Sequence, residues 1–172
     1  MSAEPLKFEP RKPIKLDIGS GANRRDHDYT TVDLFHENGD IKAPMWDIPL
    51  PDNSVEAIWS EHALEHVAMA KVPETLKEWH RLLKPGGRAI IQVPNFDYVA
   101  KYWLTGPDRG WAEQMVFGQQ WNEGEFHKSA FTAAILRADL EAAGFEVLRV
   151  EMRWTHNQET LQAVARHRLT GV

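Results

Sequence analysis

Apolar and polar side chains alternate over the first predicted element, and a glycine ends the pattern. Ile14, Leu16 and Ile18 are separated by single polar residues, and Gly19 follows them directly. A period of two is typical of a strand with one buried face, and a glycine after it indicates a turn. We therefore predict strands over residues 14–18 and 30–34, and a weaker third one over residues 40–43.

Strand-like and helical patterns follow one another through the middle of the chain. The turn signal Asp52-Asn53 precedes an apolar strand pattern over residues 55–59. Apolar residues then recur at helical spacing from residue 72 to residue 83, with Pro73 suited to the first turn. Residues 84–87, KPGG, end that helix. We predict a central strand, buried on both faces, over residues 88–93 and a further helix over residues 96–104.

The last third of the chain begins with a long segment that has no clear period. Residues 105–128 are rich in glycine and predict a lid or binding loop. We expect its Trp111 and Trp121 to pack as a local core, with stacking on an acceptor as the alternative. Thr132 suits the N-cap of a following helix, and Gly144 suits its end. Two final strands are predicted over residues 146–153 and 161–168.

This order of elements predicts an α/β fold with one mostly parallel sheet and an antiparallel C-terminal edge. Strand and helix alternate, which favours parallel pairing, whereas the last two strands are joined by a turn. Asp33 follows Gly19 by 14 positions, where a dinucleotide-binding unit has about 20. Helices are therefore expected to be reduced in the first half, which leaves one face of the sheet open. A second copy of the chain could cover that face as a homodimer.

Length and composition narrow the class of protein. The 172 residues predict one domain over 14–172, preceded by a loose arm over 1–13. A net charge of −5 argues against nucleic acid as the main partner. Cysteine is absent, which excludes disulfides and thiolate metal sites and agrees with a cytoplasmic location. No run of residues has the length of an apolar signal or membrane segment, so no membrane association is expected.

Chemistry-bearing residues follow the predicted strands, at the sheet edge where α/β proteins bind ligands. Gly19 and Gly21 allow a sharp bend and a close approach of the backbone to a ligand. Asp33 follows the second strand, where an acid accepts from both ribose hydroxyls. Asp47 could accept from an exocyclic amine while the Ile48 amide donates to a ring nitrogen. Each feature alone also fits an ordinary turn or a solvated acid, but their order indicates one nucleoside site. That interpretation requires a cleft shared by Gly19, Asp33 and Asp47.

These segments together resemble the ordered motifs of class I S-adenosylmethionine-dependent methyltransferases, especially small bacterial methyltransferase-domain proteins. The resemblance implies a Rossmann-like fold with S-adenosylmethionine as cofactor. It implies that Gly19 and Gly21 lie against the methionine part, that Asp17 positions its amino group and that Asp33 holds the ribose. The motifs that carry it are residues 16–21 (LDIGSG), 31–34 (TVDL), 47–54 (DIPLPDNS), 61–66 (EHALEH), 81–87 (RLLKPGG) and 127–132 (HKSAFT). The expected cofactor-binding residues are Asp17, Gly19, Ser20, Gly21, Asp33, Leu34, Asp47, Ile48, Ser60 and Glu61.

Histidines near the predicted site suggest the acid–base chemistry. His66, His62 and His127 are the candidate catalytic residues, because histidine titrates in the useful range when an acceptor must lose a proton. Structural hydrogen bonding or plain solvent exposure is the alternative for each. Residues 62–66, HALEH, also match the H-x-x-E-H pattern of inverted zinc peptidases. We favour the methyltransferase interpretation, with no metal, because it explains five segments where zinc explains one.

The sequence thus predicts methyl transfer from S-adenosylmethionine to an unidentified, small-molecule acceptor. Two alternatives stay open at this point. One is a catalytically inactive domain that binds S-adenosylmethionine or S-adenosylhomocysteine, which the missing crossover helix favours. The other is the zinc peptidase.

Overall fold

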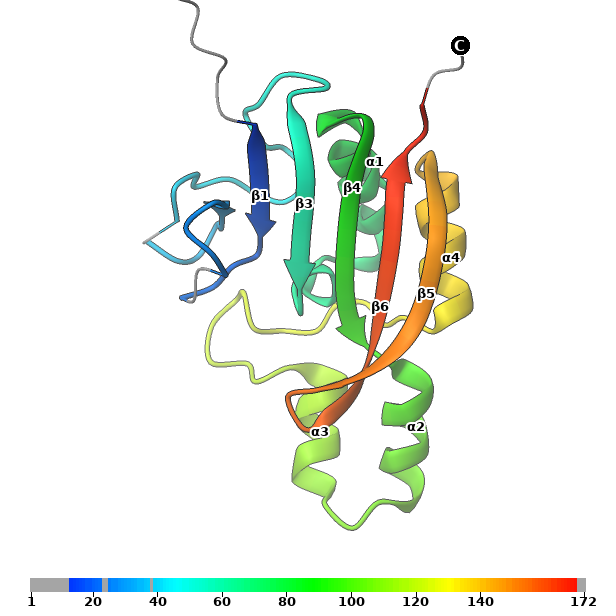
Figure 1. The fold of residues 1–172 in the computed structure, drawn as a ribbon. Helices are drawn as coiled ribbons and strands as arrows, with labels where there is room; N and C mark the ends of the chain where they lie inside the picture. Colours follow the sequence, from blue (N-terminus) through cyan, green and yellow to red (C-terminus); the bar gives the residue numbers. More distant parts are fainter. Residues whose placement is uncertain (1–12, 23–24, 38, 170–172) are drawn as a thin grey trace, which may run out of the picture.

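Six strands form one sheet in the computed structural model, which describes residues 13–22, 25–37 and 39–169. The strand order is β2-β1-β3-β4-β6-β5, with β1 to β4 parallel and β6 antiparallel to both β4 and β5 (Figure 1). This arrangement confirms the predicted fold class. The strands are β1 (Ile14–Ile18), β2 (Thr30–Val32), β3 (Val55–Glu61), β4 (Leu83–Pro94), β5 (Phe145–Thr155) and β6 (Gln158–His167).

The central strand β4 begins earlier than its sequence pattern predicts. Leu83 pairs with Val55 of β3, but the next pair along the two strands is Arg88 with Ala57. The KPGG segment is therefore an irregularity within β4 rather than a separate turn, and Gly86 takes a φ of +82° there. Beyond it the strand is buried almost continuously, as expected for a strand at the centre of the sheet.

Two helices, α1 (Val72–Leu82) and α4 (Ala133–Ala142), lie together behind the sheet (Figure 1). The helix α1 starts with Pro73 in its first turn and buries an apolar stripe that includes Leu76 and Trp79. The predicted caps of α4 are confirmed, because the Thr132 side chain accepts from the Ile135 amide and Gly144 has a φ of +103°. The core of the protein lies between these helices and the sheet.

The predicted lid contains a helix that the sequence analysis missed. α2 (Phe96–Thr105) and α3 (Arg109–Phe117) form a hairpin below the carboxyl ends of the central strands (Figure 1). Only Ala112 of α3 is fully buried, so the helix has no apolar stripe to reveal it. Its Trp111 packs against Tyr102 of α2 with ring centroids 4.4 Å apart. Trp121 is 80% exposed, so the expected core role was wrong for that residue.

No α-helix occurs among the described residues before Val72. The described residues that link β1 to β2 and β2 to β3 are irregular, as expected. The first helical turns are the 3-10 segments η1 (Leu64–His66) and η2 (Met69–Lys71). The strand predicted over residues 40–43 was wrong, because only an isolated bridge joins Ile41 to Val32. The predicted arm lies outside the described residues except for residue 13. None of the described helices is long and apolar enough to cross a membrane.

Candidate functional site

Two adjoining cavities open at the carboxyl ends of the parallel strands. The first has a volume of about 780 Å³ and lies between the ends of β1 and β3, the helix α3 and the β5–β6 turn. The second, of about 200 Å³, lies between the end of β2 and the segment that follows it. Gly19, His62 and His66 border both cavities. The edge of the sheet that the sequence analysis singled out is therefore hollowed, as the α/β architecture predicts.

The bend after β1 requires glycine for two independent reasons. Gly19 has a φ of +72°, and a Cβ added there would lie 2.2 Å from the Cβ of Ala63. Its amide donates to the Val32 carbonyl, which ties the bend to β2. Gly21 has a φ of +56° and borders the second cavity, and Ser20 borders the first. The backbone of this bend thus forms the wall between the two cavities.

Asp33 is held rigidly at the edge of the second cavity. It is 7% exposed, and its carboxylate accepts from the amides of Gly21 at 2.9 Å, Phe35 at 2.8 Å and His36 at 2.9 Å. These bonds turn the chain after residue 32, which explains why β2 is shorter than predicted. Two carboxylate oxygens offer about four acceptor positions, so one position can still accept from a ligand hydroxyl. Leu34, 37% exposed, borders the same cavity.

Asp17 and Glu61 border the first cavity from the ends of β1 and β3. Asp17 is 4% exposed and accepts from the Arg25 amide at 3.1 Å. The Arg25 guanidinium lies over the Trp59 ring, 3.3 Å from its centroid, and 3.8 Å from the Glu61 carboxylate. These contacts hold Arg25, which lies between β1 and β2, against the residues that border the first cavity. Arg25 and Trp59 were not predicted from the sequence, since nothing local marks a contact over such a separation.

The structure does not bring Asp47, Ile48 or Ser60 to either cavity. Asp47 is exposed and borders neither. Ile48 is 1% exposed, and its amide donates to Glu78 of α1 rather than facing a ligand. Ser60 lies fully buried within β3. Met45 and Trp46, just before the predicted pair, border the second cavity in their place.

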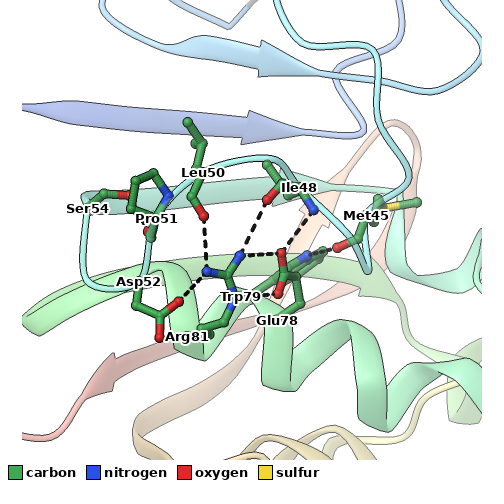
Figure 2. A network of polar contacts seen from close by, with 9 residues as sticks. All are labelled: Met45, Ile48, Leu50, Pro51, Asp52, Ser54, Glu78, Trp79 and Arg81. Atoms are coloured by element: carbon green, nitrogen blue, oxygen red, sulfur yellow. Dashed lines mark hydrogen bonds and ion pairs between the residues drawn. The ribbon is translucent and has the colours of Figure 1, made fainter.

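A polar network fixes the segment around Ile48 to α1 (Figure 2). The Arg81 guanidinium donates to Glu78, to Asp52 and to the carbonyls of Leu50 and Ile48. These charged and hydrogen-bonded neighbours, Glu78 first among them, raise the pKa of Arg81. We call Arg81, Glu78 and Asp52 with these carbonyls the loop anchor. It explains why the Ile48 amide points away from the cavity, because the Glu78 carboxylate already takes its hydrogen.

Three histidines and one glutamate gather at the floor of the first cavity. His62, with a φ of +50°, donates from Nδ1 to the Glu65 carboxylate at 3.3 Å. The rings of His66 and His127 pack edge to face with centroids 4.9 Å apart. The Lys128 and Ser129 amides donate to the Glu65 carbonyl, which locks the 126–129 segment onto η1. We call His62, Glu65, His66 and His127 the histidine cluster.

The histidine cluster has perturbed acid–base properties. Burial raises the pKa of Glu65, but the His62 hydrogen bond and the neighbouring histidines outweigh it and leave the pKa lowered. Burial lowers the pKa of His62, yet the hydrogen bond and charge of Glu65 leave that pKa raised. Burial also lowers the pKa of His127, and this effect exceeds the opposing effect of the Glu65 charge, so the pKa of His127 is lowered. One cluster thus holds a histidine with a raised pKa and another with a lowered pKa, and such perturbed groups are typical of sites of proton transfer.

The zinc-peptidase arrangement is not found at this segment. That arrangement places two histidines four apart on one face of an α-helix, as in H-x-x-E-H motifs. Here His62 lies before η1 in a left-handed conformation, and only residues 64–66 are helical, as one 3-10 turn. Glu65 is the cluster member that sequence reasoning did not select, although it lies within the EHALEH motif.

Comparison with known sequences finds similarity to methyltransferases. Residues 16–91 match the family model described as a methyltransferase domain. A protein of Mycolicibacterium smegmatis, named a probable S-adenosylmethionine-dependent methyltransferase, is 29% identical over 121 residues. The alignment covers 69% of this chain but only 37% of that relative, so the chain spans little more than a third of its length.

Comparison with solved structures shows the fold over nearly the whole chain. A Methanosarcina mazei structure described as a SAM-dependent methyltransferase has a TM-score of 0.67 at 17% identity, covering 98% of this chain and all of that one. A Burkholderia thailandensis N1-methyltransferase, solved with 1,6-didemethyltoxoflavin and S-adenosylhomocysteine, has a TM-score of 0.61 at 19% identity. It matches 91% of this chain and 72% of its own.

Proposed function

We propose that this chain, which is similar to S-adenosylmethionine-dependent methyltransferases, methylates a small molecule held in the first cavity. The observation that carries the proposal is the place of Gly19, which borders both cavities. Asp33 borders the second cavity and His127 the first. A cofactor that spans the glycine bend would have its nucleoside on one side and its methyl group on the other.

The residues around the bend fit S-adenosylmethionine. Gly19 and Gly21 carry no side chain of their own, so the methionine part can lie against the backbone of the bend. Asp33 keeps one acceptor position for a ribose hydroxyl. Met45 and Trp46 border the cavity beyond Asp33 and offer apolar surface to the adenine. We assign the base to these two residues instead of Asp47 and Ile48.

The first cavity provides the acceptor site and the means to activate it. Its volume of about 780 Å³ falls within the roughly 300–1,000 Å³ typical of small-molecule sites. The sulfonium supplies a methyl group to an in-line nucleophile, so the chain contributes mainly alignment at near-attack distance. His62, His66 and His127 border the cavity and can take the proton of an acceptor hydroxyl.

Calorimetry with S-adenosylhomocysteine tests the cofactor site. Asp33→Ala should weaken binding by about 1.5–3 kcal/mol, roughly 10- to 150-fold, because it removes a charge-assisted hydrogen bond. Asp139→Ala, the same change on α4 behind the sheet, is the matched control and should bind as the unaltered protein does. Equal affinity in both variants would contradict the ribose assignment. Absence of binding in the unaltered protein would contradict the proposed function itself.

A second variant separates binding from turnover. His66→Ala should leave the affinity for S-adenosylhomocysteine unchanged and lower the rate of methyl transfer to a hydroxyl acceptor. An acceptor panel assayed with labelled S-adenosylmethionine measures the rate. Tight cofactor binding with no transfer to any acceptor would favour the inactive-domain alternative.

Homodimerisation stays a prediction, and the open face of the sheet supports it. α1 and α4 both lie behind the sheet, and none of the described helices lies over the other face of β1 and β3 (Figure 1). Light scattering after size exclusion tests it, and a strict monomer at all concentrations would contradict it. The cytoplasmic location and the lack of a nucleic-acid partner also stay predictions.

A further inference from the structure

A carboxylate oxygen lies buried between two histidines at the floor of the first cavity. The Oε2 atom of Glu65 is inaccessible to solvent and has no hydrogen-bond partner among the described residues. Glu65 is 1% exposed, and it offers a ligand atom within 4.8 Å of one from His66 and one from His127. Buried polar atoms almost always have a partner, so this oxygen lacks the partner that burial normally requires.

The other polar atom of each of these side chains is already held. His66 Nδ1 lies 3.2 Å from the Phe126 carbonyl, and His127 Nδ1 lies 2.9 Å from the Met115 carbonyl. Because a carbonyl only accepts, Nδ1 carries the hydrogen in both rings, and Nε2 keeps a lone pair. Metal-binding histidines are oriented in this way by a backbone carbonyl on the far nitrogen. Glu65 Oε1 is likewise held by His62 Nδ1 at 3.3 Å.

We infer that Glu65, His66 and His127 bind one divalent transition-metal ion through Oε2 and the two Nε2 atoms. Two imidazoles and one carboxylate form a ligand set that suits Zn²⁺ or Fe²⁺ and leaves positions open for substrate. Bonds of about 2.0–2.2 Å place neighbouring ligand atoms roughly 3–3.6 Å apart. The ligand atoms lie within 4.8 Å of one another, so side-chain rotations must shorten these distances when the ion binds. His62 stays outside the set and orients the carboxylate, which distinguishes this site from the zinc-peptidase pattern.

The ion would lie beside the acceptor, and this step rests on the proposed function. Glu65, His66 and His127 all border the first cavity. A bound ion lowers the pKa of a coordinated hydroxyl, so with the ion in place the acceptor releases its proton to water in the open cavity rather than to His66 or His127. The oxygen then forms a bond to the methyl carbon as the carbon–sulfur bond breaks, leaving a neutral thioether. The site therefore selects acceptors that bind the metal through a hydroxyl oxygen.

Zinc titration of the cofactor-free protein tests the site directly. Calorimetry should show one equivalent of Zn²⁺ bound to the unaltered chain and roughly 100-fold weaker binding to Glu65→Gln and His127→Ala. The Gln variant keeps the side-chain volume and the contact with His62, and circular dichroism verifies the fold of each variant. His167→Ala is the matched control, because His167 and His80 form another close pair with ring centroids 4.1 Å apart. That control should bind Zn²⁺ as the unaltered chain does.

Two results would overturn the site. One is the absence of Zn²⁺ binding, and the other is binding that persists in Glu65→Gln and His127→Ala but disappears in His167→Ala. Mg²⁺, which prefers oxygen ligands, should bind at least about 100-fold more weakly than Zn²⁺. Equal affinities for the two ions would contradict the assigned ligands.

Titration with S-adenosylhomocysteine keeps this inference separate from the proposed function. Cofactor binding without Zn²⁺ binding would overturn the metal site alone. Zn²⁺ binding without cofactor binding would support the metal site and overturn the methyltransferase proposal.

Discussion

The loop anchor and the histidine cluster are both polar and partly buried, and both hold an irregular segment against the helices and strands. They differ in whether each polar atom has a hydrogen-bond partner within the chain. In the loop anchor, Arg81 donates to Glu78, Asp52 and two backbone carbonyls, and Glu78 also accepts from the Ile48 amide (Figure 2). In the histidine cluster, Glu65 has one oxygen bonded to His62 and one without a partner among the described residues. The first network is complete within the chain, whereas the second requires a ligand.

This difference separates structural from functional polar groups. A satisfied network in a half-buried place stabilises the fold, since every donor and acceptor lost from water is replaced. An incomplete network costs stability and persists where it serves binding or catalysis. The loop anchor borders neither cavity, while the histidine cluster borders the larger one. Substitutions in the loop anchor should therefore change the stability of the fold, whereas substitutions in the histidine cluster should change the binding of a ligand.

The largest effect is expected from removing the centre of the loop anchor. Arg81→Ala leaves the Glu78 carboxylate, 11% exposed, without its main cation and frees the carbonyls of residues 48 and 50. We expect a loss of about 3 kcal/mol in the free energy of unfolding and a fall in Tm of about 6–12 °C. Thermal unfolding followed by circular dichroism measures it.

Arg137→Ala is the control for Arg81→Ala. Arg137 forms an exposed pair with Glu141 on α4, and such pairs contribute about 0–1 kcal/mol. Similar losses in the two arginine variants would contradict the structural role of the loop anchor.

The next effect is a stabilisation that only the histidine cluster should provide. Zn²⁺ at 100 times its Kd should raise the free energy of unfolding by about 2.7 kcal/mol and the Tm by about 5–11 °C. Arg81→Ala should show the same rise from its lower starting point, because the loop anchor binds no metal. Glu65→Gln should show a rise of only about 0.4 kcal/mol, because its roughly 100-fold weaker binding leaves it half saturated at this Zn²⁺ concentration. A zinc-induced rise in Glu65→Gln equal to that of the unaltered chain would remove the distinction between the two networks.

The smallest effect concerns His80, the α1 residue next to Arg81. Burial lowers the pKa of His80 from its usual 6.5, and the nearby His167 lowers it further. Below pH 6.5 the unfolded chain therefore binds a proton that the folded chain resists, so stability falls as the pH drops from 6.5 towards the folded pKa. Above that range His80 contributes no pH dependence.

Urea unfolding at pH 7.5 and 5.5 measures this dependence. His80→Gln should reduce the decline in stability between the two pH values, although the lowered pKa of His127 leaves part of it. His27→Gln, at an exposed histidine, should leave the decline unchanged. A decline that is identical in all three proteins would show that His80 does not contribute.

Local patterns were sufficient for most of the framework. The alternation in residues 14–18 predicted β1 with its observed bounds, and the Thr132 cap and Gly144 were predicted correctly at the ends of α4. These features depend on neighbours one to four residues away, so the sequence records them directly. The helix α3 was missed because its rings pack on α2 rather than on the core, which leaves no apolar period.

The sequence by itself determined the strand order along the chain, the glycine bend at Gly19 and the carboxylate at Asp33, because each depends on backbone geometry at a strand end. Only the tertiary structure decided which groups face the cavities. It turned the Ile48 amide to Glu78, which is 30 residues away, and it brought His127 beside Glu65 and His66. The physical reason is that hydrogen bonds and packing across such separations are selected by the whole fold, and no local pattern encodes them.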